Sequence, residues 1–468
     1  MRPYRLVLTA VLCLVLVAAA LIAWAVTRGG PPSYAATITV DTTAKTSGAL
    51  GPRYIGLSVE SAALNSGKIT TAGNLAALLG NLGHSVLRFG GNSADTSFSG
   101  ISPSALRGLA ALASASGWSV LYTENEAAYD AATVTADARA VKSALGAKLF
   151  AFACGNEPDA YRDNGLRPRD YSVDDYLSQA TACLQAIRSA APHAPLEGPD
   201  TAGNRSWFSA YAEREDGTVS WLGQHYYPMG CRAAGDRPAA LVTDMLSPGL
   251  AATEATTLAW YVATAKSVGK QLLITETNSA CGGGIPGLSD SYASALWAID
   301  YLLTGAEQGV RGMYFHTGAL DSGCAGYVVL CATGPDSYRA QPIYYGLLFA
   351  HLLGTGQFLP AKVSTPSGKG NVAAFALKSP GGGLRLMLEN LSPDNLDATL
   401  RLGSYSGSAS VLRLTGPGPL ATSGVQIQGS TVAANGRFAP GSPENAHCGR
   451  GNCFVTLAPY SAALITAG

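Results

Sequence analysis

The sequence predicts an α/β protein: a (β/α)₈ barrel followed by an antiparallel β-sandwich. Between residues 52 and 356, short apolar runs alternate with longer stretches of helical period. From residue 357 to 468, short alternating runs are separated by Gly, Pro, Ser and Asn, the pattern of a β-sandwich. A doubly wound sheet would require a glycine-rich phosphate-binding turn after its first strand, and the sequence has none.

The predicted barrel strands are short and rich in apolar or β-branched residues, and we place them at 54–60, 85–89, 119–123, 148–154, 195–198, 219–225, 271–275 and 312–316. The segments between them have helical period, as at 72–82, 104–115, 131–145, 173–189, 251–268 and 290–304. This many strand and helix units within about 300 residues favour the closed barrel. Active sites of that fold lie at the carboxyl ends of the strands.

The sandwich strands are predicted at 372–377, 384–389, 399–402, 410–414 and 454–457. An earlier strand at 36–41 overlaps a segment that we assign as 37–51; it precedes the barrel, and we expect it to pair into the sandwich.

Composition limits the possible partners. The chain has 468 residues, 47% hydrophobic, so it can bury a large core and a second, smaller one. The 31 Lys plus Arg balance the 31 Asp plus Glu, and no overall field attracts nucleic acid or a highly sulfated polyanion. A small or weakly charged substrate fits this balance better.

The N-terminus has the pattern of an export segment. Arg2 and Arg5 precede an apolar run from Leu6 to Val26, and about 20 apolar residues suffice to span a bilayer. We therefore expect residues 1–36 to form an uncleaved membrane anchor and stalk, with the rest of the chain exported. The alternative is cleavage near Ala25 or Ala35, which would give a secreted protein.

Cysteine usage also indicates an oxidising compartment. With Cys13 set aside, three pairs are placed to bridge within loops or between adjacent loops: Cys324/Cys331, Cys448/Cys453 and Cys231/Cys281. Cys154 and Cys183 lie in apolar surroundings, and we interpret them as buried free thiols. No Cys/His spacing predicts a zinc site, and we expect neither metal nor cofactor.

Two apolar runs about 120 residues apart each end in a glutamate, Glu157 after the fourth predicted strand and Glu276 after the seventh. A carboxyl group at the end of a buried strand is held by the scaffold yet open to a ligand. Both would face one cavity of the barrel. Two carboxyls across a sugar-sized opening are the arrangement used in glycoside hydrolysis.

Other polar residues follow predicted strands at the same end of the barrel: Glu60, Arg88, Asn125, His225, Tyr227 and His316. Each has a second interpretation. Glu60 either binds a sugar hydroxyl or is a solvated carboxylate, and Asn125 either lines the cavity or caps a turn. Arg88 either pairs with a glutamate or is purely structural. Asp159 and Asp290 fit helix caps better than chemistry.

Several motifs resemble, in order, glycoside hydrolase family 79, the β-glucuronidase and heparanase family, and the resemblance covers most of residues 50–468. The motifs are Leu87-Arg-Phe-Gly-Gly91, Gly155-Asn-Glu-Pro-Asp159, His225-Tyr-Tyr227, Thr275-Glu-Thr-Asn-Ser-Ala-Cys-Gly-Gly-Gly284 and Pro342-Ile-Tyr-Tyr-Gly-Leu-Leu348. The glutamate that runs into three glycines is the most specific. The resemblance implies a retaining β-glucuronidase on a (β/α)₈ barrel with an appended sandwich.

Mapped onto this chain, the resemblance implies that Glu157 is the acid/base and Glu276 the nucleophile. Asn156 would bind the sugar 2-hydroxyl, Tyr227 would contact the nucleophile and His225 would position the acid. Alternatively, the His225-Tyr-Tyr227 segment only fills the barrel mouth.

In the family, the loop of Gly282 and Gly283 holds the sugar carboxylate, helped by a tyrosine that Tyr327 resembles. Cys281 departs from the pattern, since relatives often carry Tyr there, and a flexible turn without a ligand is the alternative for the glycines. Two other functions therefore stay open: a β-glucosidase or β-xylosidase of the same superfamily, and an exported carbohydrate-binding protein without turnover.

Overall fold

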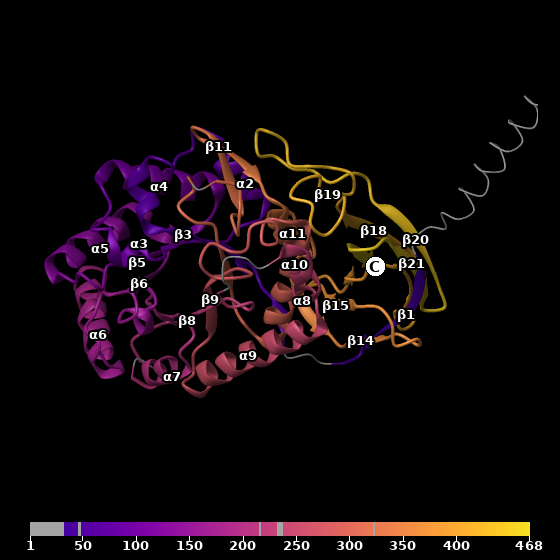
Figure 1. Cartoon of the computed structure of the whole chain (residues 1–468), viewed down its shortest axis with the longest axis horizontal. Coiled ribbons are helices and arrows are strands. Elements are labelled where there is room, and N and C mark those ends of the chain that lie inside the picture. Colours follow the sequence, from indigo (N-terminus) through magenta and orange to yellow (C-terminus); the bar gives the residue numbers. More distant parts are fainter. Residues whose placement is uncertain (1–31, 45–47, 215–216, 232–236, 322) are drawn as a thin grey trace, which may run out of the picture.

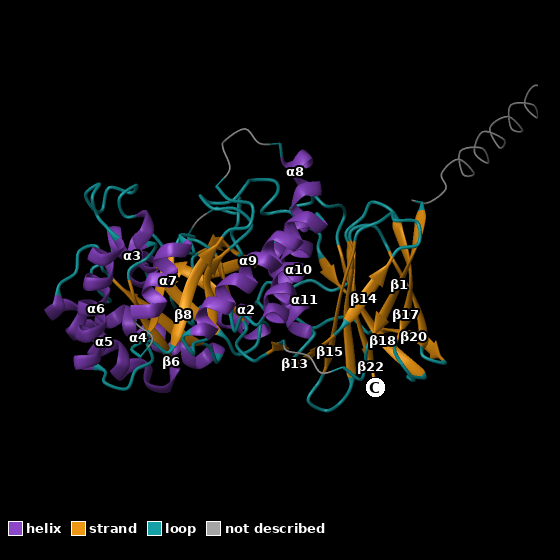
Figure 2. Ribbon diagram, turned by 90° about the horizontal axis from the view of Figure 1, so that it is seen from below, coloured by secondary structure: helices purple, strands orange, loops and turns teal. Residues whose placement is uncertain are grey.

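The computed structural model describes residues 32–44, 48–214, 217–231, 237–321 and 323–468. A helix-rich body and a β-rich body lie side by side (Figures 1 and 2). The predicted anchor, Leu6 to Val26, lies outside the described residues. Within the described ranges, no helix is both long and apolar enough to cross a membrane.

The helix-rich body is built on an eight-stranded, all-parallel sheet, and its strands begin and end within a few residues of the predicted positions. They are β3 (Ile55–Glu60), β4 (Val86–Gly90), β5 (Ser119–Glu124), β6 (Leu149–Cys154), β7 (Glu197–Thr201), β8 (Trp221–Tyr226), β9 (Leu272–Thr277) and β10 (Met313–His316). The strand order is β6-β5-β4-β3-β10-β9-β8-β7, and a parallel bridge between Phe152 and Leu196 joins β6 to β7. The sheet therefore closes into the predicted barrel.

Helices connect successive strands and cover the outside of the barrel (Figure 1). They are α2 (Leu75–Asn81), α3 (Ser93–Thr96), α4 (Pro103–Ser116), α5 (Ala131–Leu145), α6 (Val173–Ala190), α7 (Arg205–Arg214), α8 (Pro238–Met245), α9 (Pro248–Ser267), α10 (Tyr292–Gln308) and α11 (Pro342–Leu352). Three short 3₁₀ turns accompany them: η1 (Ser61–Ser66), η2 (Gly146–Lys148) and η3 (Pro158–Ala160). A hairpin of β11 (Leu330–Gly334) and β12 (Ser337–Ala340) follows β10. The strands are buried on both faces, as the continuous apolar runs of a parallel sheet require.

The β-rich body is one twelve-stranded sheet, mostly antiparallel, whose strands form two layers at the right of Figure 2. The strands are β1 (Ser33–Val40), β2 (Ala49–Leu50), β13 (Gly356–Leu359), β14 (Ala361–Ser364), β15 (Val372–Lys378), β16 (Leu384–Asn390), β17 (Asn395–Arg401), β18 (Gly407–Thr415), β19 (Gln426–Ile427), β20 (Glu444–Gly449), β21 (Asn452–Leu457) and β22 (Ser461–Ala467). Its core is separate from that of the barrel. The expected combination of barrel and sandwich is confirmed.

The strand that precedes the barrel does pair into the sandwich. β1 runs antiparallel to β14 and parallel to β17, and alternate residues such as Ile38 enter the core. The predicted stalk is wrong at its end, because Ser33–Ala36 belong to β1. Tyr34 is buried there, and its hydroxyl donates to Asn390 at 2.7 Å.

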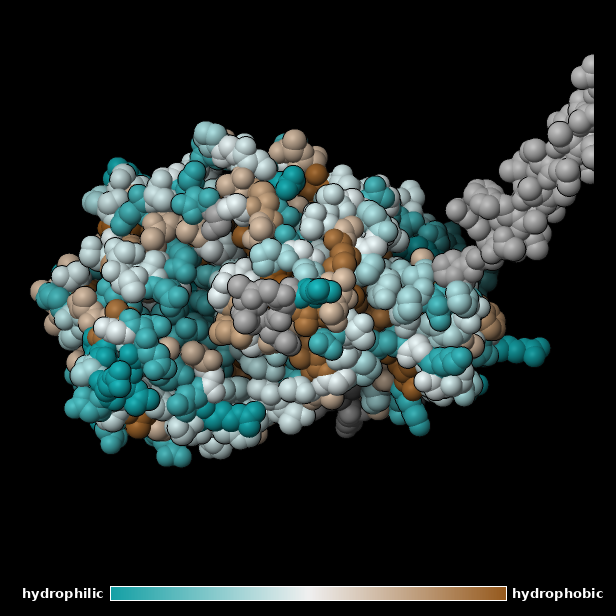
Figure 3. Space-filling model, viewed as in Figure 1, coloured by the Kyte–Doolittle hydropathy of each residue, from teal (hydrophilic) through white to brown (hydrophobic). Residues whose placement is uncertain are grey.

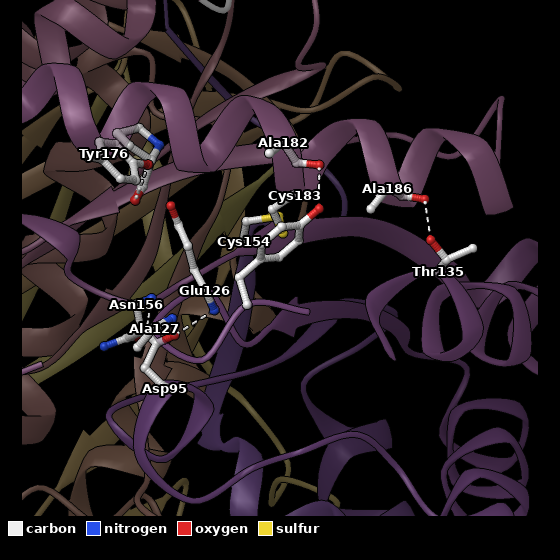
Figure 4. The surroundings of a disulfide bond; sticks show 12 residues. Asp95, Glu126, Ala127, Thr135, Cys154, Asn156, Tyr176, Ala182, Cys183 and Ala186 are labelled. Atoms are coloured by element: carbon white, nitrogen blue, oxygen red, sulfur yellow. Dashed lines mark hydrogen bonds between the residues drawn. A yellow bond between two sulfur atoms is a disulfide. The ribbon is translucent and has the colours of Figure 1, made fainter. Parts of the chain in front are cut away.

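Four disulfides are present among the described cysteines, and three of them were predicted: Cys231–Cys281, Cys324–Cys331 and Cys448–Cys453. The prediction of free thiols at Cys154 and Cys183 is wrong, because they form the fourth disulfide, between β6 and α6 (Figure 4). Residues 29 apart in sequence meet because α6 packs back on its own strand, a contact that apolar flanking residues do not reveal. The disulfides support an exported protein.

Candidate active site

The turn after β6 presents Glu157 to the carboxyl end of the barrel. Gly155 and Glu157 both have positive φ, 75° and 55°, so the chain turns sharply as it leaves the strand. Asp95 fixes this turn, since its buried carboxylate accepts from the backbone N–H of Asn156 at 2.7 Å and from the hydroxyl of Tyr161 at 2.7 Å. The same carboxylate accepts from the N–H groups of Glu126 and Ala127, which follow β5 (Figure 4).

Glu276 lies inside β9, and four side chains contact its carboxylate, one of them Ser58, whose Oγ donates to Oε2 at 3.5 Å. Arg88 donates to its Oε2 at 2.8 Å, the Tyr227 hydroxyl donates to its Oε1 at 2.8 Å, and His316 Nδ1 lies 3.5 Å from Oε2. Burial raises the pKa of the Glu276 carboxyl, but the charges of His316, His225 and Arg88 outweigh it and lower that pKa to about 2. Glu276 is therefore ionised at neutral pH.

The two glutamates meet across the barrel mouth, as their sequence positions predict. A carboxylate oxygen of Glu157, one of Glu276 and a ring nitrogen of His225 all lie within 4.8 Å of one another. Figure 3 views this end of the barrel, where hydrophilic residues surround a recess. Three such groups could also ligate a metal ion, but the guanidinium of Arg88 contacts both Glu276 and His225, and its charge opposes a second cation there.

Arg88, at the centre of β4, is fully buried and joins the Glu157 side of the site to the Glu276 side. Its Nη1 donates to Glu276 and to Ser58 Oγ, at 2.8 and 2.9 Å. Its Nη2 donates to Asn156 Oδ1 at 2.9 Å and to Asp200 Oδ2 at 2.8 Å. Burial opposes its charge, but Asp200 and Glu276 more than compensate and raise the pKa of Arg88. Its predicted ion pair with a glutamate is present.

His225, on β8, lies between Glu157 and the buried pair of Arg88 and Asp200. Its Nδ1 lies 3.0 Å from Glu157 Oε1, and its Nε2 lies 3.6 Å from Asp200 Oδ1. Burial and the charge of Arg88 lower the pKa of His225. The charges of Glu276 and Asp200 raise it by more, and the net result is a pKa of about 9. An imidazolium at this position donates a hydrogen bond to the Glu157 carboxylate and restrains its rotamer.

Glu60 and His316 form a second pair beside Glu276. His316 Nε2 lies 3.5 Å from Glu60 Oε1, and Ser93 donates to Glu60 Oε2 through its backbone N–H and its hydroxyl. Burial raises the pKa of Glu60, but His316 and Ser93 lower it by more, so the pKa of Glu60 lies below its ordinary value. Glu60 is thus a partly buried, ionised acceptor at the rim of the site.

Tyr327 lies next to Tyr227, on the Glu276 side of the site. Its ring stacks on that of Tyr227 at 6.1 Å between centroids, and its backbone N–H donates to the carbonyl of Gly283 at 3.1 Å. Gly282 and Gly283 have φ of 69° and 94°, and no heavy atom would lie within 4 Å of a Cβ built on either. The glycine loop therefore has positive φ, open space and a neighbouring tyrosine.

Asn125, Asp159 and Asp290 have structural partners. The side chain of Asn125 donates to the Phe98 carbonyl and accepts from Ala128 N–H, so it stabilises the turn after β5. Asp159 accepts from the N–H groups of Ala202 and Asn204, before α7, and Asp290 accepts from Gly287 N–H. Asn125 thus follows its turn-capping interpretation, and the two aspartates hold loops rather than capping their own helices.

Sequence reasoning missed Ser58, Asp95 and Asp200. Ser58 Oγ donates to Glu276 Oε2 at 3.5 Å, whereas Asp95 and Asp200 contact neither glutamate side chain and act through backbone groups and other side chains. Their signal was available, since each follows or lies in a strand on the same rim as the glutamates. Position alone, however, does not separate such a residue from a loop carboxylate or a strand serine.

Comparisons with known proteins find relatives of this chain among glycoside hydrolases. No family model matches the chain. A β-glucuronidase of Aspergillus niger is 26% identical over 358 residues, which cover 65% of this chain and 62% of that protein. A heparanase of Gallus gallus is 28% identical over 218 residues, which cover 43% of this chain and 37% of the heparanase. The chain thus matches less than two thirds of the length of these relatives.

Solved structures extend the similarity to the whole fold. A 4-O-α-L-rhamnosyl-β-D-glucuronidase from Fusarium oxysporum 12S superposes with a TM-score of 0.76 at 20% identity, covering 92% of this chain and 100% of that one. A GH51 arabinofuranosidase from Xanthomonas axonopodis pv. citri has a TM-score of 0.69 at 14% identity, covering 93% and 100%. The comparisons support the resemblance drawn from the motifs: the chain is similar in sequence to β-glucuronidases and to a heparanase, and the solved structures share its fold.

Proposed function

We propose that the protein is a retaining β-glucuronidase that releases β-linked glucuronate from a glycan or glycoconjugate. The observation that carries the proposal is the approach of Glu157 and Glu276 to within 4.8 Å between carboxylate oxygens, in different surroundings. Retaining glycosidases place their two carboxyl groups about 5 to 5.5 Å apart, whereas inverting enzymes need a wider gap for water.

In the first step, Glu276 attacks the anomeric carbon while protonated Glu157 gives its proton to the leaving oxygen. The glycosidic bond breaks, the aglycone leaves with that proton, and an ester to Glu276 forms. Arg88 and Tyr227 keep the Glu276 carboxylate ionised and correctly oriented, because each contacts one of its two oxygens.

In the second step, Glu157 removes a proton from water, which attacks the same carbon and releases Glu276. Asn156 supports both steps. Its side-chain Oδ1 accepts from Arg88. The side-chain Nδ2 is therefore the donor available to the sugar 2-hydroxyl. Such a contact strengthens in the transition state.

The sugar carboxylate would be held by backbone N–H groups of the Gly282–Gly283 loop and by the hydroxyl of Tyr327. Open space at both glycines supports close approach of a ligand to the backbone. Cys281 contributes no thiol donor, because it is bonded to Cys231. This departure favours a second candidate, a retaining β-glucosidase or β-xylosidase, whose substrate lacks the carboxylate.

A panel of p-nitrophenyl β-glycosides tests the proposal. We expect turnover of the glucuronide at least about 100-fold above that of the glucoside and xyloside, since a site built for a polar group discriminates strongly. Preference for a neutral sugar would establish the second candidate. No turnover of any glycoside, with binding retained, would leave a carbohydrate-binding protein.

Stereochemistry is tested separately. A 2-deoxy-2-fluoro-β-glucuronyl fluoride should trap an ester on Glu276, visible by mass spectrometry of the peptide that contains it. Proton NMR of the first-formed sugar should show the β anomer, and an α anomer would contradict the retaining mechanism.

A further inference from the structure

Asp200, at the end of β7, contacts both halves of the site although it touches neither glutamate side chain. It is 1% exposed and has a φ of 54°. Its Oδ2 accepts from Arg88, and its Oδ1 accepts from the hydroxyl of Thr275, the residue before Glu276. On the other side, Oδ1 lies 3.6 Å from His225 Nε2, and the backbone carbonyl accepts from Glu157 N–H at 2.9 Å.

We propose that Asp200 is a positioning residue for both catalytic glutamates, acting on Glu276 through Arg88 and Thr275 and on Glu157 through His225 and its own carbonyl. The inference rests on the proposed glycosidase function.

On the nucleophile side, Asp200 fixes the direction of the Arg88 fork. A buried guanidinium between two carboxylates has a defined plane only if both are present. With Asp200 neutralised, Arg88 loses one of its two anionic partners and can turn toward Glu276 alone. That rotation would also release Asn156, which shares Nη2 with Asp200.

On the acid side, Asp200 stabilises the proton on His225. The charged and titratable groups that face this imidazole are Glu157, Glu276, Arg88 and Asp200. Asp200 is one of the carboxylates that raise the pKa of His225, against the opposing charge of Arg88. Removal of the Asp200 charge therefore favours neutral His225, which no longer donates to Glu157 when its Nδ1 is unprotonated.

Glu197 lies next to Asp200, and the two carboxyl groups together carry a single negative charge. Both carboxylates pack over Gly223 of β8, where an added Cβ would lie 1.5 Å from Glu197 Oε1 and 2.6 Å from Asp200 Oδ1. Glu197 is fully buried, and burial and the neighbouring Asp200 charge raise its pKa. Glu197 is thus the neutral member of the pair and Asp200 the ionised one.

The test is Asp200→Asn in the full chain, with Glu254→Gln as the matched control. Glu254 is also a buried carboxyl, bonded to Trp297 Nε1 at 2.9 Å, but it lies on α9 away from the site. We expect Asp200→Asn to lower kcat on p-nitrophenyl β-glucuronide about 100-fold with KM changed less than about threefold, the size typical of a misplaced catalytic group. The control should keep wild-type kcat.

A second readout separates positioning from a merely structural role. In ¹⁵N-histidine NMR, His225 should titrate at a lower pH in Asp200→Asn than in the wild type. A folded Asp200→Asn protein with unchanged His225 titration, or with kcat within twofold of the wild type, would overturn the inference.

If Asp200→Asn does not fold, Thr275→Val serves instead, because it keeps the β-branched shape and removes only the hydroxyl bonded to Asp200. We expect about a fivefold loss of kcat, the equivalent of one hydrogen bond. Unchanged kcat would contradict the inference. Failure of the proposed function is distinguishable, since the wild type itself would then turn over no glycoside.

Discussion

The ends of β6 and β9 each present a glutamate to the same opening, but they hold it differently. Glu276 lies within β9, where the pairing with β8 and β10 shifts register, and has Arg88, Tyr227 and His316 around its carboxylate. Glu157 stands in a left-handed turn, and its side chain, 20% exposed, contacts His225. In the proposed mechanism, a nucleophile must be ionised when it attacks the sugar, whereas an acid/base must gain and lose a proton in each cycle. The different surroundings match those two requirements.

The largest expected effect is that of Glu276→Ala. Loss of the nucleophile should reduce kcat on p-nitrophenyl β-glucuronide by at least about 10⁴-fold, as for removal of other covalent nucleophiles. Steady-state assays with the Glu254→Gln control measure it. If Glu276→Ala kept activity close to that of the wild type, the assignment of Glu276 as the nucleophile would be wrong.

Glu157→Ala should have an effect that depends on the leaving group. Because a p-nitrophenolate leaves without protonation, glycosylation of the enzyme should be largely spared, and the ester on Glu276 should accumulate as a burst. With an alkyl or sugar aglycone, we expect a loss of about 10³-fold, within the range of general acid catalysis. An equal loss on both substrate types would contradict the assignment of Glu157 as the acid.

Arg88→Lys tests whether the nucleophile side needs a charge or a fork. A lysine keeps the charge but cannot reach Glu276, Asp200 and Asn156 together. We expect kcat to fall about 100-fold with correct folding, judged by circular dichroism. Wild-type kcat in the lysine variant would show that charge alone suffices.

Removal of the Cys154–Cys183 disulfide should affect stability more than chemistry. Replacing both cysteines with Ser should lower the free energy of unfolding by about 3 kcal/mol, because the bond closes a long loop. The same change at Cys448 and Cys453, only 5 apart in sequence, should cost less. Urea denaturation of the two double variants compares them, and equal losses would contradict the loop-length argument.

The smallest effect is a pH dependence of stability from His225. Its pKa is about 9 in the folded protein, above the value near 6.5 of an unfolded histidine, so its contribution is complete below about pH 6.5 and is lost as pH rises through about 9. We expect Tm to fall more between pH 6.5 and 9 in the wild type than in His225→Gln. Parallel curves for the two proteins would exclude this contribution.

Most of the fold was predictable because its signals are local. A strand buried on both faces must be a continuous apolar run, and a helix that covers it must repeat its apolar residues with helical period. The eight barrel strands were therefore found to within a few residues at each end. The cysteines show the limit, since Cys154 and Cys183 pair through the packing of α6 on β6, which neither flanking sequence encodes.

The sequence by itself determined the barrel, the sandwich, the resemblance to family 79 and the two strand ends that carry Glu157 and Glu276. These follow from apolar periodicity and from short motifs, which depend on residues close in the chain. Only the tertiary structure decided that Arg88 joins both sides, that Asp200 lies beneath them and that Asn125 stabilises a turn. The physical reason is that a buried charge acquires its role from the partners that folding brings within hydrogen-bond distance, and those partners lie on other strands.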